Sequence, residues 1–335
     1  MASATRSAAP FEVGLTRWNC AVCGADDTAP YRPGMYAIGD VPFDLVRCRP
    51  CGLVYTSPRP DGDTLERMYD DPGYYTHGYN LGVESDNYFD RQDELLVQYD
   101  GEVAALEAEC GLDAKAAPAL MELGSAGGFF IEAARRRGWR VQGVELSPPA
   151  ARYSIDELEL PVFEGLLERA PFEPASFDVC VADNVLEHTT SPADVLAHLY
   201  RLLRPGGHLL VVVPSYVNSA FFRGFRTAGK MLPRTLLGPQ LLRLLKMDED
   251  HDGGYPYHIL EFHRPTLQRL LGASGFETVS MKGSVPYPAH LFKEPRPSLR
   301  QRGLRAAFRS ANTLMRARLA PPARLRALVR RPFDS

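Results

Sequence analysis

From residue 118 onwards, short apolar runs alternate with stretches in which apolar residues recur every three or four positions. The apolar runs lie at residues 118–123, 176–182 and 209–213. The stretches between them have the spacing of a helix that buries one face. Strands that alternate with helices in this way form a parallel sheet covered by helices on both faces. The pattern therefore predicts an α/β, doubly wound and mostly parallel sheet over residues 118–292.

The first predicted strand runs into a glycine-rich turn, Gly124-Ser125-Ala126-Gly127-Gly128. Glycine lets the backbone approach a ligand closely, and the helix that follows directs its N-terminal amides at that ligand. Glu145 closes the next strand 21 positions after Gly124, where a carboxylate can accept hydrogen bonds from both ribose hydroxyls. An adenosine-containing ligand satisfies both features. The alternative is an ordinary tight connection between a strand and a helix.

The turn lacks the third glycine of the G-x-G-x-x-G dinucleotide-binding pattern, and Glu122 stands two residues before its first glycine. In these features the chain resembles the class I S-adenosylmethionine (SAM) methyltransferases. Three further segments follow in the family's order: Ser176-Phe177-Asp178-Val179, Asn184-Val185-Leu186-Glu187-His188 and Leu203-Arg204-Pro205-Gly206-Gly207-His208. The resemblance implies a Rossmann-like catalytic domain with SAM as cofactor. It places cofactor-binding roles on Glu122, Gly124, Ser125, Gly127, Gly128, Glu145, Leu146 and Asn184.

Four of the six cysteines form two C-x-x-C pairs, each followed by glycine: Cys20 with Cys23, and Cys48 with Cys51. Tetrahedral thiolate ligation of zinc takes two cysteines from each tight turn, and four protein thiolates leave no open coordination position. The spacing therefore predicts a structural zinc site in a ribbon over residues 18–57. The alternatives are a redox pair or buried thiols without a metal.

The chain is expected to divide into five segments. They are a disordered leader (1–17), the zinc ribbon (18–57), a tyrosine-rich connector and helix (58–117), the SAM domain (118–292) with a basic insertion (220–247), and a basic helical tail (293–335). Apolar residues at helical spacing support the helix of the connector and an amphipathic helix that starts near Leu299 in the tail.

The net charge of −3 hides a strong segregation of charge. Residues 220–247 carry six basic residues and residues 296–331 carry eleven arginines, with no acidic residue in either segment. A cationic amphipathic helix can pack on the domain, lie on an anionic membrane surface or bind nucleic acid. The arginines lack interleaved stacking aromatics, which makes nucleic acid the least favoured partner.

His188 is the first candidate for a catalytic base. Methyl transfer from a sulfonium is an in-line displacement, so the protein positions the acceptor and, for a weak nucleophile, removes its proton. His188 follows the fourth strand at the carboxyl edge of the sheet, and Glu187 is expected to orient it. The alternative is a histidine that only hydrogen-bonds a loop. Quinone-pathway O-methyltransferases hold a metal with a similar Glu-x-x-Glu-His segment, but Asn184 replaces the first glutamate here, which argues against a catalytic metal.

Tyr74 and Tyr75 are the second candidates for the acceptor site. Bacterial methyltransferases with an N-terminal zinc ribbon, including sugar C-methyltransferases, carry a similar tyrosine-rich segment that reaches the acceptor. The alternative is that these tyrosines pack the ribbon against the main domain. His258 ranks third among the catalytic candidates.

Taken together, the resemblance implies a SAM-dependent methyltransferase with a small-molecule acceptor. Sugar C-methyltransferases carry a further domain, whereas only 43 residues follow Phe292, so O-methylation of a saccharide, glycolipid precursor or natural product is favoured over C-methylation. One alternative is an RNA methyltransferase that binds RNA with its ribbon and arginine-rich tail. The other is a non-enzymatic scaffold with a degenerate SAM domain, against which the intact glycine turn argues.

The sequence predicts a cytoplasmic protein. No apolar run approaches the length of a membrane span, and residues 1–10 lack the apolar region of a signal peptide. The 45% of hydrophobic residues is ample for a globular core. The basic segments add peripheral association with a membrane as a second expectation.

Overall fold

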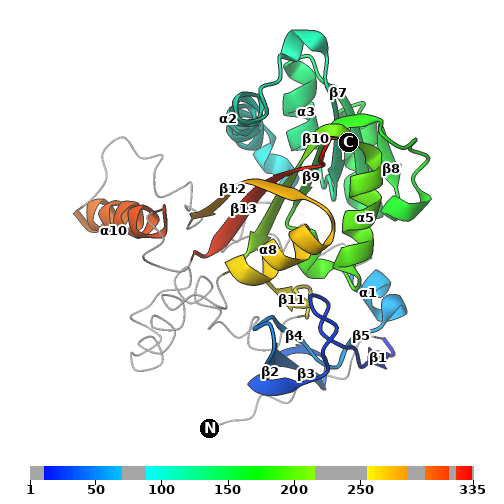
Figure 1. Ribbon diagram of the computed structural model, residues 1–335, viewed down its shortest axis with the longest axis vertical. Coiled ribbons are helices and arrows are strands. Elements are labelled where there is room, and N and C mark those ends of the chain that lie inside the picture. Colours follow the sequence, from blue (N-terminus) through cyan, green and yellow to red (C-terminus); the bar gives the residue numbers. More distant parts are fainter. Residues whose placement is uncertain (1–10, 70–87, 216–254, 285–298, 317–321, 334–335) are drawn as a thin grey trace.

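The computed structural model describes residues 11–69, 88–215, 255–284, 299–316 and 322–333. Two sheets dominate these residues: a seven-stranded, mostly parallel sheet flanked by helices, and a four-stranded antiparallel sheet built mainly from the N-terminal segment (Figure 1). The arrangement confirms the α/β, Rossmann-like, doubly wound fold that the sequence predicts.

The large sheet has the strand order β12-β13-β10-β9-β6-β7-β8. Its strands are β6 (Ala119–Leu123), β7 (Arg140–Glu145), β8 (Val162–Glu164), β9 (Phe177–Asp183), β10 (Leu203–Pro214), β12 (Glu277–Ser284) and β13 (Arg324–Arg330). The five strands from β6 to β10 are parallel, and β13 runs antiparallel between β10 and β12. The chain order reverses between β6 and β9, which places a ligand crevice at the carboxyl ends of these two strands.

The strands are apolar on both sides because both faces of the sheet are covered. Along β10, Leu209, Val211 and Val213 belong to one hydrophobic core and Leu210 and Val212 to another. Side chains alternate between the two faces of a strand, so a strand buried on both sides is a nearly continuous apolar run.

The helices of the described residues are α1 (Gly62–Tyr69), α2 (Gln92–Cys110), α3 (Phe129–Arg136), α4 (Pro148–Arg152), α5 (Pro192–Leu202), α8 (Arg264–Ala273) and α10 (Leu299–Arg316). Shorter turns are η2 (Tyr88–Arg91), η3 (Ala114–Ala116), η4 (Tyr153–Glu157), η5 (Leu167–Arg169) and η6 (Leu186–His188). Helices α2 and α3 pack together on one face of the large sheet, and α5 and α8 supply the core of the other. None of the described helices is long and apolar enough to cross a membrane.

The small sheet has the order β11-β4-β3-β2. Its strands are β2 (Thr28–Ile38), β3 (Val41–Cys48), β4 (Val54–Thr56) and β11 (Leu260–Glu261), and a separate pair joins β1 (Leu15–Thr16) to β5 (Arg59–Pro60). Strand β11 lies more than two hundred residues after β4 in the chain, yet the two strands pair directly. The ribbon predicted over residues 18–57 is therefore completed by a distant segment.

The predicted disordered leader over residues 1–17 is wrong in its last part. Leu15 pairs with Pro60 and Thr16 with Arg59, and the Gly14 amide donates a hydrogen bond to Thr64 Oγ1 at 2.9 Å. Short antiparallel pairing of this kind satisfies backbone groups that a disordered segment leaves to water. Residues 1–10 lie outside the described residues.

The predicted boundary between the SAM domain and the basic helical tail is also wrong. The helical part of the tail is present as α10, but Arg324–Arg330 forms β13 inside the large sheet, between β10 and β12. Leu325, Ala327 and Val329 are buried in the core of one face and Leu328 in that of the other. The catalytic domain thus includes residues that the sequence assigns to the tail.

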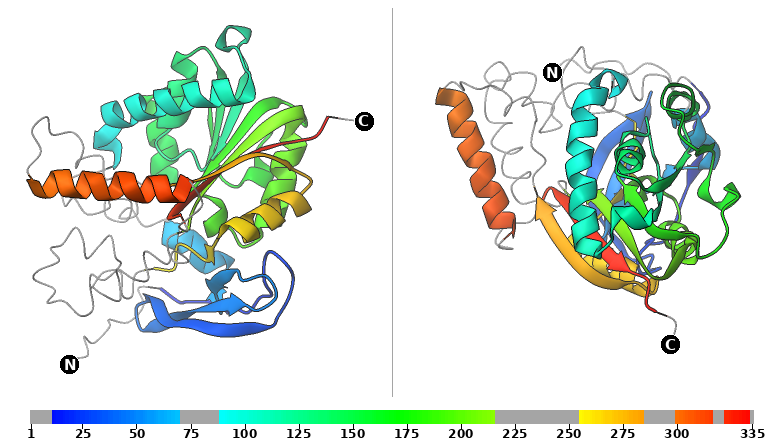
Figure 2. Two further views of the ribbon diagram at one scale, coloured as in Figure 1. Left: turned by 60° about the vertical axis from the view of Figure 1, so that its left-hand side comes forward. Right: turned by 90° about the horizontal axis from the view of Figure 1, so that it is seen from above.

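The basic insertion over residues 220–247 lies outside the described residues, as does most of the tyrosine-rich stretch of the connector. The connector helix predicted at its C-terminal end is present as α2, and Gly111 ends this helix in the left-handed conformation. Figure 2 shows α10 at the periphery of the molecule, on the side of α2 and β12.

Candidate functional site

The glycine turn joins β6 to α3 at the carboxyl edge of the large sheet. Gly124 has φ +71°, and a Cβ atom there would lie 2.6 Å from Val185 Cγ2. Gly128 has φ +75°, and a Cβ atom there would lie 2.6 Å from Leu160 Cδ1. Both glycines are therefore required by the packing of the turn itself, whether or not a ligand is bound.

Glu145 holds this turn to the end of β7. Its Oε2 accepts a hydrogen bond from the Ala126 amide and its Oε1 accepts one from the Ser147 amide, both at 2.8 Å. The carboxylate is buried, and carboxylate oxygens can each accept more than one hydrogen bond. The position predicted for a ribose-binding carboxylate is thus rigid and close to the turn.

Two polar groups near the turn are buried without a partner in the described part of the chain, Glu122 Oε2 and Ser125 Oγ. Burial raises the pKa of the Glu122 carboxyl well above its usual range, and the carboxylates of Asp183 and Glu145 raise it further. Buried polar groups normally have a hydrogen-bond partner, so orphaned groups here fit the ammonium and hydroxyl donors of SAM. The residues at the turn therefore suit the cofactor that the sequence predicts.

The other predicted cofactor residues lie along the same edge. Gly127 is buried in the turn, Leu146 is half-buried directly after β7, and Asn184 is exposed directly after β9. Asn184 has φ +53°, and its Nδ2 donates to Asp183 Oδ1 at 2.8 Å. Asp183 in turn accepts two hydrogen bonds from Arg324 Nη2 of β13, at 2.7 and 3.0 Å. Arg324 has no role in the sequence-based interpretation, because its partner lies 141 residues away.

The turn η6 places Glu187 and His188 next to the cofactor turn. Val185, immediately before η6, is the residue whose side chain occupies the space beside Gly124. Glu187 is fully buried, and burial raises the pKa of its carboxyl well above the usual range, with further contributions from Asp183 and Glu261. Its Oε1 lies 3.7 Å from His188 Nε2, which is too long for a hydrogen bond.

His188 is held by two partners through one ring nitrogen. Its Nδ1 lies 2.8 Å from the hydroxyl of Tyr69 and 2.8 Å from the carbonyl oxygen of Tyr257. A carbonyl oxygen can only accept, so Nδ1 carries the hydrogen and Nε2 is the ring nitrogen without one. The geometry leaves Nε2 as the basic atom of His188.

His258 completes this group from a third segment of the chain. Its ring packs edge-on against that of His188, with ring centroids 4.9 Å apart. Ligand atoms of Glu187, His188 and His258 all lie within 4.8 Å of one another, close enough to share a divalent cation. The absence of a catalytic metal, which the sequence predicts from Asn184 alone, stays a prediction.

Tyr74 and Tyr75 lie outside the described residues. The structure instead brings Tyr69 and Tyr257 to His188, and the rings of these two tyrosines contact each other with centroids 5.6 Å apart. Tyr69 ends α1 and belongs to the tyrosine-rich stretch, and its place in that stretch is the one sequence signal that points to it.

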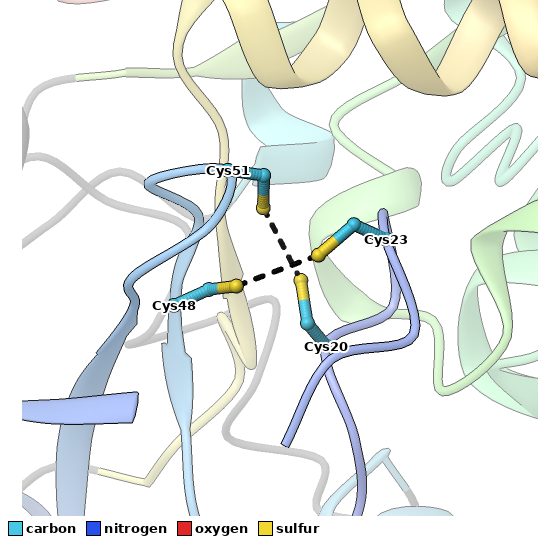
Figure 3. A group of neighbouring side chains, drawn as sticks. All are labelled: Cys20, Cys23, Cys48 and Cys51. Atoms are coloured by element: carbon cyan, nitrogen blue, oxygen red, sulfur yellow. Dashed lines mark hydrogen bonds between the residues drawn. The ribbon is translucent and has the colours of Figure 1, made fainter. Parts of the chain in front are cut away.

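The four predicted cysteine ligands converge on one point (Figure 3). The Sγ atoms of Cys20 and Cys51 are 3.4 Å apart, those of Cys23 and Cys48 are 3.5 Å apart, and all four lie within 4.8 Å of one another. Zinc–sulfur bonds of about 2.3 Å in a tetrahedron place sulfurs about 3.8 Å apart, so the donor set fits zinc. Burial raises the pKa of the Cys20 thiol to about 11, and a bound cation would favour the thiolate instead.

Residues 121–211 match the methyltransferase domain family. The match covers only part of the chain, and the strand order, the glycine turn and the acidic residue at the end of β7 agree with it.

Curated relatives are ubiquinone biosynthesis O-methyltransferases. That of Ralstonia nicotianae is 35% identical over 171 residues, which span 49% of this chain and 65% of the relative, just under two thirds. That of Azoarcus sp. is 27% identical over 190 residues, 55% of this chain and 73% of the relative. Among solved structures, a SAM-dependent methyltransferase from Archaeoglobus fulgidus is 15% identical with a TM-score of 0.46, covering 73% of this chain and 100% of that one.

Proposed function

We propose that the protein transfers a methyl group from SAM to a hydroxyl oxygen of a small molecule. The observation that carries this proposal is the orientation of His188 beside the cofactor turn: Nδ1 faces the carbonyl oxygen of Tyr257, so Nε2 is the ring nitrogen that can accept a proton. A base at this place serves an acceptor that is not already ionised, such as an alcohol or a phenol.

In this reaction His188 Nε2 would take the proton of the acceptor hydroxyl as the acceptor oxygen bonds to the methyl carbon and the carbon–sulfur bond of SAM breaks, which leaves S-adenosylhomocysteine. SAM, when bound, supplies an electrophilic methyl group on a positively charged sulfur. Tyr257 and Tyr69 hold the imidazole in one tautomer and one orientation during the transfer. Burial raises the pKa of the Glu187 carboxyl, which lies 3.7 Å from His188 Nε2, and so disfavours a negative charge beside the ring.

The acceptor that we propose is a hydroxyl of a saccharide, a glycolipid precursor or a natural product. The name of the relatives adds phenolic precursors of a quinone to these classes. C-methylation is the less favoured reaction of the same site. The test is a screen with SAM labelled in its methyl group against panels of saccharides, lipid-linked precursors, phenols and RNA. Label in a hydroxyl compound that disappears with His188→Ala supports the proposal, and label confined to RNA contradicts it.

We also propose that the four cysteines hold a structural zinc ion. The converging thiols of Cys20, Cys23, Cys48 and Cys51 support it, and none of them forms a disulfide. Elemental analysis of the purified protein should give one zinc per chain, and Cys48→Ser should remove it. Protein without metal that still keeps an ordered ribbon would contradict this assignment.

For the partners, we propose an anionic membrane surface at α10. Arg302 and Arg309 are exposed on this helix, whereas Arg324, Arg326 and Arg330 of β13 are bonded to carboxylates of the body. The exposed arginines of α10 thus differ from those of β13, which stabilise the fold. Arg302→Glu with Arg309→Glu should reduce cosedimentation with vesicles rich in phosphatidylserine, while Arg269→Glu, on the exposed side of α8, should not.

A further inference from the structure

The ribbon sheet and the acceptor side of the site share one short segment, residues 257–261. In this segment the Thr56 amide of β4 donates to the Ile259 carbonyl, and the Ile259 amide donates to the Glu187 carbonyl, both at 3.0 Å. Ile259 is thus bonded to the ribbon through its carbonyl and to the turn that carries His188 through its amide. His258 immediately precedes it, and Tyr257 supplies the carbonyl that faces His188 Nδ1.

A second link runs through Arg59, the first residue of β5. Its Nη1 donates to the carbonyl oxygen of Thr190, two residues after His188, at 3.0 Å. Its guanidinium lies over the Trp18 ring, 4.0 Å from the ring centroid. Trp18 Nε1 in turn donates to the Thr56 carbonyl at 2.8 Å. The loop that follows His188 is therefore fixed to the ribbon by a half-buried cation between an aromatic ring and a carbonyl.

The third link is helix α1, which follows β5 directly. Tyr69 at its end places its hydroxyl 2.8 Å from His188 Nδ1, and Tyr257 Oη donates to the Met68 carbonyl at 3.3 Å. Every partner of the His188 imidazole that is described above therefore comes from α1, from η6 itself or from residues 257–258.

The cysteine cluster belongs to the same packed unit. Cys20 and Cys48 are buried in one continuous core with Leu186, Ile259 and Phe262. The second cysteine turn also touches the main domain, because a Cβ on Gly52 would lie 3.4 Å from the His263 ring. The cysteine-bearing ends of the ribbon therefore pack against the segment that carries His258.

We propose that the four-cysteine ribbon is a positioning element of the acceptor site, which sets the placement of His188 and His258 relative to each other. This inference rests on the proposed methyl transfer. The cofactor turn is held differently: Gly124 and Ser125 donate their amides to the Val144 carbonyl and Ala126 donates to Glu145, all within the large sheet. Loss of the bound metal should therefore loosen the acceptor side and leave SAM binding in place.

The first experiment compares three variants of the full chain. Cys51→Ser removes a ligand, Cys51→His keeps a ligand that zinc accepts, and Cys110→Ser replaces a half-buried cysteine at the end of α2 as the control. The measurements are zinc content, SAM affinity by calorimetry, kcat and KM for the acceptor, and amide hydrogen exchange by peptide.

Cys51→Ser should lose zinc, exchange at least tenfold faster in peptides that contain Thr56 and Ile259, and keep exchange rates in the peptide that contains Gly124. Its SAM affinity should stay within about threefold while kcat falls at least tenfold, the effect of a displaced base. Cys51→His should restore both exchange and kcat, and Cys110→Ser should behave as the wild type.

Unchanged exchange at Ile259 after loss of zinc would overturn the inference, and so would an equal loss of protection at Gly124, because that result means general unfolding. The proposed function fails separately, when the wild type methylates none of the acceptors offered. In that case the hydrogen-exchange rates still show whether the ribbon stabilises the segment that contains His258.

A second pair of variants leaves the cysteines intact. Arg59→Met keeps an apolar stem over Trp18 but removes the bond to Thr190, and the control, Arg49→Met, removes an exposed ion pair with Asp27 on the same ribbon. Arg59→Met should lower kcat about fivefold or more, with zinc content and SAM affinity unchanged, the effect of a base that is slightly misplaced. Equal kcat values for the two variants would contradict the proposal that Arg59 positions the loop after His188.

Discussion

The two halves of the candidate site are built in different ways. The cofactor half comes from successive connections of a single sheet, with Gly124–Gly128 after β6 and Glu145 at the end of β7. The acceptor half comes from three segments that lie far apart in the chain: the end of α1, the turn η6 and residues 257–258. One half is therefore a property of the sheet, whereas the other exists only when two sheets are packed together.

This difference predicts that the two halves can be disabled separately. Variants in the acceptor half should leave cofactor binding intact, and variants in the glycine turn should weaken it. A change in the large sheet should weaken both halves, because the turn η6 that carries His188 follows β9 of that sheet and Val185 before it packs beside Gly124 of the cofactor turn.

The largest effect is expected from truncation after residue 321. This deletion removes β13, which pairs with both β10 and β12 and supplies the buried Leu325, Leu328 and Val329 together with the Arg324–Asp183 ion pair. Exposing two strand edges and a core in this way should abolish the cooperative unfolding transition and SAM binding together. Circular dichroism on heating checks the fold. A truncated protein that melts like the wild type would show that β13 is dispensable.

Replacement of the base should separate the halves most clearly. His188→Ala should lower kcat by about a hundredfold, the usual contribution of a general base, and leave SAM affinity within a few-fold. Steady-state kinetics and calorimetric titration on the same preparation test both statements. An active His188→Ala enzyme would indicate an acceptor that is already ionised, such as a phenolate.

The matched change in the other half is Glu145→Ala. It removes the acceptor of the Ala126 and Ser147 amides and the carboxylate expected to bind the ribose, so SAM affinity should fall by about tenfold or more. At saturating SAM its kcat should recover towards the wild-type value. A SAM affinity equal to that of the wild type would remove Glu145 from the cofactor site.

A smaller effect is expected for Tyr69→Phe. The ring still packs against His188 and Tyr257, but the hydroxyl 2.8 Å from His188 Nδ1 is lost. One neutral hydrogen bond is worth about 1 kcal/mol, so kcat should fall by about fivefold without a change in SAM affinity. Tyr31→Phe, on the ribbon, is the control, and equal kinetics of the two variants would exclude a role for Tyr69.

The last prediction concerns stability, not catalysis, and depends on pH through Glu187. Burial raises the folded-state pKa of this carboxyl, so its contribution to stability is full below the unfolded-state pKa and is lost as pH rises towards the folded-state value. Glu187→Gln removes this titration. Above about pH 5, the free energy of unfolding of the variant minus that of the wild type should increase with pH. The increase should be at most about 1.4 kcal/mol per pH unit. If the free energies of unfolding of the two proteins depended on pH in the same way, Glu187 would not titrate as described.

The parts of the molecule that sequence predicts well are those whose signal is local. The glycine turn and each C-x-x-C pair are short sequence motifs, Glu145 bonds an amide only 19 residues before it, and the structure brings these groups together. By contrast, the contact of Tyr69 with His188 spans 119 residues, and no local pattern marks it.

Strand β13 shows a second reason why a prediction from sequence can be wrong. Its sequence, Arg-Leu-Arg-Ala-Leu-Val-Arg, continues an arginine-rich segment that has the period of an amphipathic helix further upstream. The basic charge of that segment favours a position on the protein surface. In the structure, however, Arg326 forms an ion pair with Glu109 and Arg330 forms one with Glu277. The partners that make this strand compatible with the sheet lie more than fifty residues away.

The pairing of β11 with β4 also has a consequence for synthesis. When the ribbon leaves the ribosome, Leu260 and Glu261 are still about two hundred residues from being made. Until then β4 is an edge strand with free backbone groups, the kind of edge on which other chains can add. Domains generally begin to fold from the N-terminus during synthesis, but this ribbon can close its sheet only after the strands of the large sheet up to β10 have emerged. The nascent chain is therefore most exposed to mispairing with another copy during that interval.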